Sequence, residues 1–391
     1  MIKKKILFVI ESLVAAGAEK SLVTLLNELD YSKYDVDLQL FSYGGEFERY
    51  LPEQVNLLPP LPFLEFLSGH KQGTARMWIS RLFYSFWIRF GKDQSIKGKA
   101  RKWWICAKSN IEVFQNDYDV VIGYSQCIPT FYVVDKVRAQ KKIGWVNCIY
   151  HLDGKEREWQ KKYYDALDKV ILVSMGALTH LKQVYPEYSD KMELMLDMIS
   201  ATTITRLSAE KEQPFEDSIN SKLLTVARLD DRDKGYDITL EACKILRDRG
   251  LKFKWYAIGR GSYRKEMEEY IAANSLQDCF ILLGTTPNPY PYIKNCDIYV
   301  QTSRHEGFGL SIAEARILNR PVVTTKFDSV YNQMVPNKNG LVVPINATAV
   351  ADAIQRLLED KSLYNSIVDF QRQEKKGNVE EIEKFYQLIE N

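Results

Sequence analysis

The sequence lacks the features that mark several common classes of protein. Its 391 residues carry a net charge of only +2, which gives no indication of a nucleic-acid-binding protein. It contains no heptad repeat and no low-complexity stretch, which excludes fibrous and disordered classes. Its six cysteines are scattered, without a C-x-x-C pair or a histidine at zinc-ligand spacing. We therefore expect a globular cytoplasmic protein with reduced cysteines and no nucleic-acid partner.

Motifs of familiar nucleotide-binding and hydrolytic enzymes are also missing. There is no P-loop and no G-x-S-x-G elbow, and His305 and Glu306 are not followed by the second histidine of a zinc hydrolase. Gly259 and Gly261 form G-x-G after an expected strand, but Arg264 occupies the place of the third glycine of a dinucleotide fingerprint. NAD and FAD are therefore disfavoured.

Short β-branched runs alternate with amphipathic stretches along most of the chain. This alternation is typical of a parallel sheet covered by helices on both faces. The first run, residues 6–10, ends at Glu11 without a small-residue cleavage site, so we interpret it as a buried strand and not as a signal peptide. The pattern pauses over residues 200–221, a polar stretch with Pro214 that indicates a linker, and then restarts. The sequence therefore predicts an α/β protein with two doubly wound, Rossmann-like parallel-sheet domains and a cleft between them.

Residues 71–108 differ from this pattern. They contain ten basic residues against one acid, Asp93, and four of the seven tryptophans. Polar positions recur every three to five residues from Arg76 to Lys92, which predicts a helix with one polar stripe and large apolar residues elsewhere. One interpretation is an interfacial helix with its cations at anionic headgroups, and the other is an ordinary amphipathic helix packed on the first domain. The segment is too short and too charged to span a bilayer.

The stretch ARLDDRDKGYD, residues 227–237, places basic side chains directly after a strand. Arg228 and Lys234 suit a diphosphate, because a guanidinium binds phosphate oxygens in pairs and an ammonium supplies a compact charge. The alternative is a solvated loop in which the acids Asp230, Asp231 and Asp233 pair with these bases.

The stretch EGFGLSIAEA, residues 306–315, follows another strand. Gly307 and Gly309 allow close backbone approach, and a helix that begins at Ser311 offers free N–H groups to an anion. Glu306 and Glu314 are positioned to accept hydrogen bonds from sugar hydroxyls. For Glu314 there is an alternative, because S-x-x-E also matches a capping box in which the glutamate only binds the helix N-terminus.

Together these motifs resemble a known family. VARL, DKG, AIGRG, LLG, NPYPYIKNCDIYVQTSRHEGFGLSIAEA, RPVVTT and NGLVVP resemble, in order and spacing, the retaining glycosyltransferases of family 4, also called glycosyl transferases group 1. GAEKSL and KIGWVNCIYHLD give a looser match in the first domain. The resemblance implies a GT-B fold, with an acceptor domain at residues 1–200, a donor domain at residues 201–375, and a helix at residues 376–391 that packs back on the first domain.

The resemblance also implies roles for individual residues. Glu306, Arg228 and Lys234 are the expected catalytic residues: Glu306 contacts the donor sugar, and the two bases hold its diphosphate. Glu314 contacts the ribose. The further expected donor-binding residues are Gly17, Gly259, Phe308, Gly309 and Leu310. Asn147 is a candidate sugar contact that stands where many members carry histidine, and Asp197 stands where asparagine is common.

We therefore expect an enzyme of the hexosyltransferase class. It would move a sugar from a nucleotide-sugar, expected to be a UDP-sugar, to a glycan or polyprenyl-linked acceptor in capsule, exopolysaccharide or lipopolysaccharide synthesis. No metal or other cofactor is expected, because the basic residues and the helix N-terminus stabilise the departing diphosphate. The expected location is the cytoplasm, at the anionic inner face of the cell membrane. The alternatives are another GT-B enzyme, such as a nucleotide-sugar epimerase or a phosphorylase, and a non-catalytic nucleotide- or glycan-binding partner.

Overall fold

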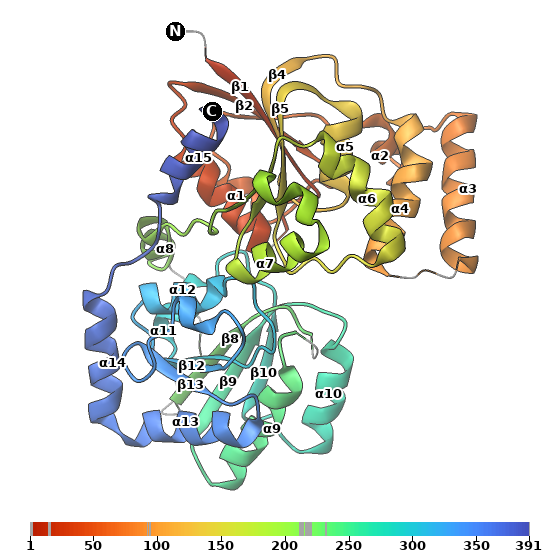
Figure 1. The fold of residues 1–391 in the computed structure, drawn as a ribbon. Helices are drawn as coiled ribbons and strands as arrows, with labels where there is room; N and C mark the ends of the chain where they lie inside the picture. Colours follow the sequence, from red (N-terminus) through yellow and green to blue (C-terminus); the bar gives the residue numbers. More distant parts are fainter. Residues whose placement is uncertain are drawn as a thin grey trace. The chain divides into compact units, whose positions relative to one another are not determined.

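A computed structural model of the chain describes residues 3–14, 17–91, 93, 95–210, 215, 221–230 and 233–390. The chain forms two compact units. Unit 1 comprises Met1–Asp197 and Glu380–Asn391, and unit 2 comprises Met198–Val379. Each unit is built around its own parallel sheet, which confirms the predicted α/β class with two doubly wound domains (Figure 1).

The sheet of unit 1 has seven strands in the order β3-β2-β1-β4-β5-β6-β7, and all its pairings are parallel. The strands are β1 (Lys4–Ile10), β2 (Tyr34–Leu40), β3 (Val55–Leu57), β4 (Asp117–Gly123), β5 (Arg138–Val146), β6 (Lys169–Leu172) and β7 (Met192–Leu194). The helices are α1 (Gly17–Glu28), α2 (Pro62–Leu67), α3 (Ala75–Phe90), α4 (Ile96–Ala107), α5 (Ile128–Lys136), α6 (Gly154–Ala166), α7 (Met175–Val184) and α15 (Glu381–Glu390).

Strand β1 is buried on both faces, which explains its uninterrupted apolar run. Leu7 and Val9 belong to a core cluster with Phe131 of α5, whereas Phe8 points to the opposite face, because successive side chains of a strand alternate. There Phe8 stacks on Phe385 of α15, with ring centroids 5.9 Å apart.

The last helix, α15, packs on the sheet of unit 1. Lys4 Nζ donates to the Ile389 carbonyl at 2.7 Å, and Lys141 Nζ donates to the Leu388 carbonyl at 2.7 Å. Both ammonium groups bind carbonyls of the final turn. These carbonyls have no amide partner within the helix, and the helix dipole favours positive charge at this end. The chain thus enters unit 1, builds unit 2, and returns to unit 1 with its last helix.

The sheet of unit 2 has six parallel strands in the order β10-β9-β8-β11-β12-β13. The strands are β8 (Ser221–Val226), β9 (Phe253–Ile258), β10 (Phe280–Gly284), β11 (Ile298–Gln301), β12 (Val322–Thr325) and β13 (Gly340–Val343). The helices are α8 (Ala201–Leu207), α9 (Tyr236–Asp248), α10 (Arg264–Ala273), α11 (Tyr290–Asn295), α12 (Leu310–Ile317), α13 (Ala347–Glu359) and α14 (Lys361–Gln373).

Two predictions along the chain need correction. Helix α8 occupies the first part of the predicted linker at residues 200–221, because Ser200 caps it by accepting a hydrogen bond from the Thr203 amide at 3.3 Å. Most of the remaining linker, residues 211–214 and 216–220, lies outside the described residues.

The second correction concerns residues 71–108, which form α3 and α4. In α3 the residues Arg76, Ser80 and Arg89 do not make a single polar stripe, because positions three to five apart spread widely around a helix that turns by about 100° per residue. Ser80 faces inward and binds Asn110 at 2.7 Å. Lys92 lies outside the described residues. None of the described helices is long and apolar enough to cross a membrane.

Helix α4 fits the alternative of an amphipathic helix packed on the domain. Arg101 and Lys102 are buried, and Arg101 Nε pairs with the buried Glu156 of α6 at 2.6 Å. The Trp104 indole donates to Asp135 at 2.8 Å. These basic residues therefore serve the interior of unit 1 and are not available to a membrane.

Candidate functional site

The candidate site lies at the carboxyl ends of β8 and β11, in the middle of the sheet of unit 2. These strands are neighbours in the sheet, although β9 and β10 come between them in the chain and lie on the other side of β8. The direction of winding therefore reverses between β8 and β11, and ligands of doubly wound sheets bind at this switch point. Arg228 and Lys234 follow β8, and Glu306 follows β11.

Glu306 is held by three hydrogen bonds. Its Oε2 accepts from Lys234 Nζ at 2.7 Å, and its Oε1 accepts from Ser303 Oγ at 2.7 Å and from Gln301 Nε2 at 3.0 Å. The side chains of Lys234 and Glu306 are only 19% and 10% exposed, so solvent screens this ion pair little. Two of the three predicted catalytic residues are thus in direct contact.

Gly235 positions Lys234 against the end of β11. Its φ of 64° is in the left-handed region, and a Cβ atom there would lie 2.3 Å from the Thr302 carbonyl oxygen. The Thr302 hydroxyl contacts the Lys234 and Gly235 carbonyls at 3.0 and 2.9 Å, and the Arg304 amide donates to the Asp233 carbonyl at 2.7 Å. The glycine therefore allows the two loops to approach more closely than any other residue would permit.

Arg304 and Asp237 strengthen the same junction. The guanidinium donates from Nη1 to Asp237 Oδ1 at 2.8 Å and from Nη2 to Oδ2 at 2.6 Å, a two-point pairing. Burial raises the pKa of Asp237, but the hydrogen bonds and charge of Arg304 outweigh it and lower the pKa below its usual value. Neither residue was predicted from the sequence, where an arginine before His305 and an aspartate in a helix have no distinctive spacing.

Arg228 is held differently from the other predicted catalytic residues. Its side chain is 62% exposed and pairs with Asp233 at 3.4 Å and with Asp230 at 3.7 Å, as the solvated-loop alternative expected. Asp231, the third acid of that alternative, lies outside the described residues. Arg228 has no ion pair with Glu306 among the residues that the structure describes. An exposed guanidinium on a short acidic loop remains accessible to an anionic ligand.

Gly259 and Gly261 hold the backbone around Arg228. A Cβ atom at Gly259 would lie 1.9 Å from the Ala227 carbonyl oxygen, and one at Gly261 would lie 2.0 Å from that of Leu229. The Leu229 amide donates to the Arg260 carbonyl at 2.9 Å. The G-x-G pattern thus has an intramolecular reason, since it lets the loop after β9 pack against the loop that carries Arg228.

The loop before α12 differs from the predicted capping box. The helix begins at Leu310 with Gly309 as its N-cap, and no side chain caps it. Gly309 has a φ of 80°, in the left-handed region that glycine adopts readily. The helix was expected to begin at Ser311 but begins one residue earlier, so Ser311 lies within its first turn. Glu314 is buried, and its Oε1 accepts from the Tyr290 hydroxyl at 3.4 Å. The capping-box alternative for Glu314 is therefore wrong.

The same loop leaves backbone donors at the start of α12. Gln333 Nε2 binds the Phe308 carbonyl and, at 3.1 Å, the Gly309 carbonyl, which holds the loop in place. Within the described residues the amides of Phe308, Gly309 and Leu310 donate to no acceptor. Three backbone N–H groups at the positive end of a helix dipole favour an anionic ligand.

The candidate residues of unit 1 lie after β1 and β5. Gly17 is the first residue of α1, and the preceding residues Ala15 and Ala16 lie outside the described part of the chain. Asn147 Nδ2 donates to the Tyr124 carbonyl at 2.9 Å, and the Asn147 amide donates to Gln126 Oε1 at 3.1 Å. The Asn147 side chain is thus fixed within unit 1 by its own hydrogen bonds.

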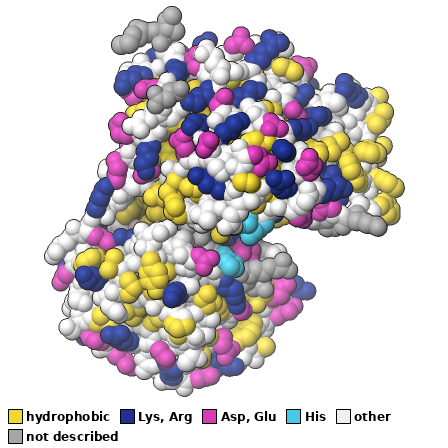
Figure 2. Space-filling view, viewed as in Figure 1, with side chains coloured by type: hydrophobic (Ala, Val, Ile, Leu, Met, Phe, Trp, Pro, Cys, Tyr) yellow, Lys and Arg dark blue, Asp and Glu magenta, His cyan; other side chains and the backbone are white. Residues whose placement is uncertain are grey.

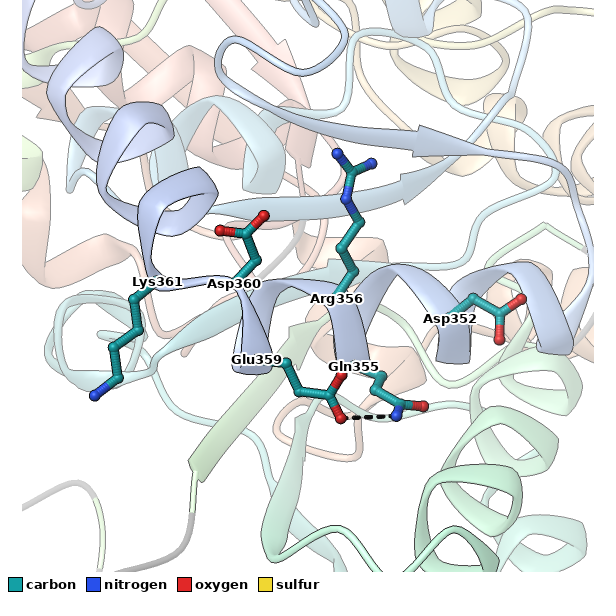
Figure 3. A pocket seen from close by; sticks show the side chains of 6 residues that line it. All are labelled: Asp352, Gln355, Arg356, Glu359, Asp360 and Lys361. Carbon is teal, nitrogen blue, oxygen red and sulfur yellow. Dashed lines mark hydrogen bonds between the residues drawn. The ribbon is translucent and has the colours of Figure 1, made fainter.

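An open hollow on the surface of unit 2 contains none of the predicted residues (Figure 3). It is lined by Asp352, Gln355, Arg356, Glu359, Asp360 and Lys361. Gln355 Nε2 donates to Glu359 Oε1 at 2.8 Å, one turn further along α13. The hollow is a solvated stretch of helix surface, and we do not place the site there.

Solved structures identify the class of fold. Over 99% of this chain and all of the other, the structure resembles a mutant of Staphylococcus aureus TarM in complex with Fondaparinux, alpha-GlcNAc-glycerol and UDP, with a TM-score of 0.69 at 14% sequence identity. At such low identity the likeness concerns the fold alone, and it is the GT-B fold that the sequence predicted.

Sequence comparison then finds a family match within unit 2. Residues 208–374, within unit 2, match the model of glycosyl transferases group 1. The chain therefore carries a group 1 glycosyltransferase domain, as its motifs predicted, and the candidate site lies inside it.

Curated relatives of the chain include bacterial glycosyltransferases. The amylovoran biosynthesis glycosyltransferase AmsK of Erwinia amylovora is 28% identical over 173 residues, which are 41% of this chain and 42% of AmsK. An N-acetylgalactosamine-N,N'-diacetylbacillosaminyl-diphospho-undecaprenol 4-alpha-N-acetylgalactosaminyltransferase of Campylobacter jejuni is 26% identical over 202 residues, 51% of this chain and 53% of that enzyme. The chain thus spans about half the length of these relatives, or less.

Proposed function

We propose that the protein is a retaining glycosyltransferase that moves a hexosyl unit from a UDP-sugar to a glycan or polyprenyl-linked acceptor in the synthesis of a cell-surface polysaccharide. The observation that carries the proposal is the contact of Lys234 with Glu306 at the switch point of the sheet, beside a helix start with unused amides. The names of the curated relatives support the polysaccharide and the lipid-linked acceptor. The UDP bound to TarM supports the nucleotide.

The reaction needs a stabilised leaving group. The bond between the anomeric carbon and the diphosphate oxygen breaks, and negative charge grows on the diphosphate. Lys234, Arg228 and the amides of Phe308, Gly309 and Leu310 supply positive charge and hydrogen-bond donors for it. We propose that this charge replaces a divalent metal, so that EDTA leaves the turnover unchanged.

Retention follows from a front-face transfer. The acceptor oxygen bonds to the anomeric carbon on the side from which the diphosphate leaves, and its proton passes to the leaving phosphate oxygen. No dedicated protein base is required. Glu306 receives hydrogen bonds from the sugar hydroxyls, and its three protein partners fix its direction before the donor arrives.

The remaining candidate residues bind the donor in this proposal. Glu314 contacts the ribose, and Gly17 and Gly259 keep their loops close to the ligand. Asn147 is a further proposed sugar contact.

The proposed location is the cytoplasmic face of the cell membrane, with peripheral contact to anionic lipid. The cysteines that the structure describes are free thiols, which fits a reducing compartment.

A panel of UDP-, GDP- and ADP-sugars tests the proposal, with and without a membrane lipid fraction. Nucleotide release and the anomeric configuration of the product are followed. A transferase releases UDP only with an acceptor and keeps the donor's configuration. An epimerase would convert the donor without an acceptor, a phosphorylase would require phosphate, and a binding protein would release no nucleotide.

Glu306→Ala tests the site itself. We expect turnover to fall by more than about 100-fold while UDP affinity stays nearly intact, because Glu306 contacts the sugar and not the nucleotide. The matched control is Glu269→Ala, which removes an exposed ion pair with Lys265 on α10 and should leave turnover unchanged. Unchanged turnover of the Glu306 variant would remove this residue from the site.

A further inference from the structure

Helix α3 presents large apolar side chains to solvent along one side. The α3 apolar face consists of Trp78, Ile79, Leu82, Phe83, Phe86 and Phe90, whose exposed fractions lie between 49% and 67%. Figure 2 shows hydrophobic side chains gathered at the edge of unit 1 where Figure 1 places α3. Contiguous exposed apolar residues of this kind mark an interaction site. We propose that the α3 apolar face docks on an anionic phospholipid membrane and sinks shallowly into it.

The spacing of these residues makes them one continuous strip. Ile79, Leu82, Phe86 and Phe90 follow one another at intervals of three and four, the spacing of a single helix face. The ring centroids of Phe86 and Phe90 lie 4.7 Å apart, so these two side chains are in contact along the strip. At about 1.5 Å per residue, the 16-residue helix is roughly 24 Å long, enough to lie along a membrane surface.

The opposite side of α3 is anchored in unit 1, so the helix is formed before it meets a membrane. Thr74 caps its start by accepting a hydrogen bond from the Met77 amide at 3.3 Å. Met77 packs against the core of unit 1, and Ser80 binds Asn110. Because the helix need not fold on binding, its apolar side chains are free to insert without an ordering cost.

Charge distinguishes a lipid surface from a second copy of the chain. Helix α3 contains Arg76, Arg81 and Arg89 and no acidic residue. All three are exposed, and among the described residues Arg76 and Arg89 form no ion pair. Two copies that met through this face would bring like charges together, whereas anionic headgroups neutralise them. The strip and the two arginines that flank it, Arg76 and Arg89, therefore fit an anionic membrane.

This inference rests on the membrane contact in the proposed function, but it requires no enzymatic activity. The test is flotation of the protein with vesicles of phosphatidylglycerol and phosphatidylcholine, compared with vesicles of phosphatidylcholine alone. We expect binding to the anionic vesicles. We expect Leu82→Glu/Phe86→Glu to weaken it at least about tenfold, because two inserted side chains become charged. The matched control is Ile345→Glu, an exposed apolar residue of unit 2.

The arginines have a separate signature. Arg76→Glu/Arg89→Glu should weaken binding to the anionic vesicles and reduce its dependence on salt, because headgroup attraction is screened by ions. All replaced residues are exposed, so the variants should keep the unfolding temperature of the wild type.

Two results would overturn the inference. One is undiminished flotation of the Leu82→Glu/Phe86→Glu variant. The other is a wild-type dimer in solution, measured by sedimentation, that this variant converts to a monomer, since a second copy would then cover the face. Neither result touches the transferase proposal, which is measured separately by nucleotide release.

Discussion

Replacing Gly235 by alanine should disrupt the candidate site through the backbone alone. The new Cβ atom would lie 2.3 Å from the Thr302 carbonyl oxygen, and this oxygen belongs to backbone that cannot rotate away. The left-handed φ of 64° costs about 1–2 kcal/mol for a residue with a side chain. The forced displacement of the loop adds about 1–3 kcal/mol, the usual cost of overpacking.

Gly250→Ala provides a matched control. Gly250 also has a left-handed φ, 79°, but nothing lies within 4 Å of its Cβ position. It should lose only the conformational cost, partly offset by the reduced freedom of the unfolded chain. The two variants should therefore differ by about 1–3 kcal/mol in the free energy of unfolding.

Denaturant unfolding and UDP titration measure the two consequences. Gly235→Ala should lower stability more than Gly250→Ala does, and it alone should weaken UDP binding, because Lys234 moves with its neighbour. Equal losses of stability and equal UDP affinities in the two variants would refute the argument that this glycine sets the approach of the two loops.

Two further predictions concern charged groups. Burial raises the pKa of Asp197 from 3.8 to about 6, so the native state binds the proton more tightly, and stability should fall as pH rises through this interval. The Asp197→Asn variant should lack this pH dependence, and near neutral pH its free energy of unfolding should exceed that of the wild type by on the order of 2–3 kcal/mol. Parallel pH profiles of unfolding for the variant and the wild type would contradict this. Arg304→Ala should lower the free energy of unfolding by about 1 kcal/mol, and by less at high salt. Arg304→Lys should recover only part of this loss, because an ammonium cannot pair with Asp237 at two points. Thermal unfolding at two salt concentrations would show the difference, and full recovery by lysine would argue against two-point pairing.

The regular parts of the fold were predictable because their signals are local. The runs that form β1, β8 and β11 are apolar on both faces, which is the pattern of strands inside a covered parallel sheet. The placement of Lys234 and Glu306 after neighbouring strands followed from the same pattern.

What could not be predicted depends on contacts between distant segments. The role of Thr302 arises from a glycine that is remote in sequence, and the role of Gly259 arises from the Ala227 carbonyl. In α3, spacing alone did not tell which side would face the protein, because that choice depends on Met77 and Ser80 finding partners elsewhere. Secondary structure depends mainly on neighbouring residues, whereas the close approach of loops does not.

The return of α15 to unit 1 has a consequence for how the protein is made. The hydrogen bond between Lys4 and Ile389 joins residues 385 positions apart. During synthesis it can therefore form only after nearly the whole chain has left the ribosome. Until then Phe8 lacks the ring of Phe385 that covers it. The continuous segment of unit 2 can fold earlier, and the nascent chain would pass through a stage with one finished unit and one unit that still lacks its last helix.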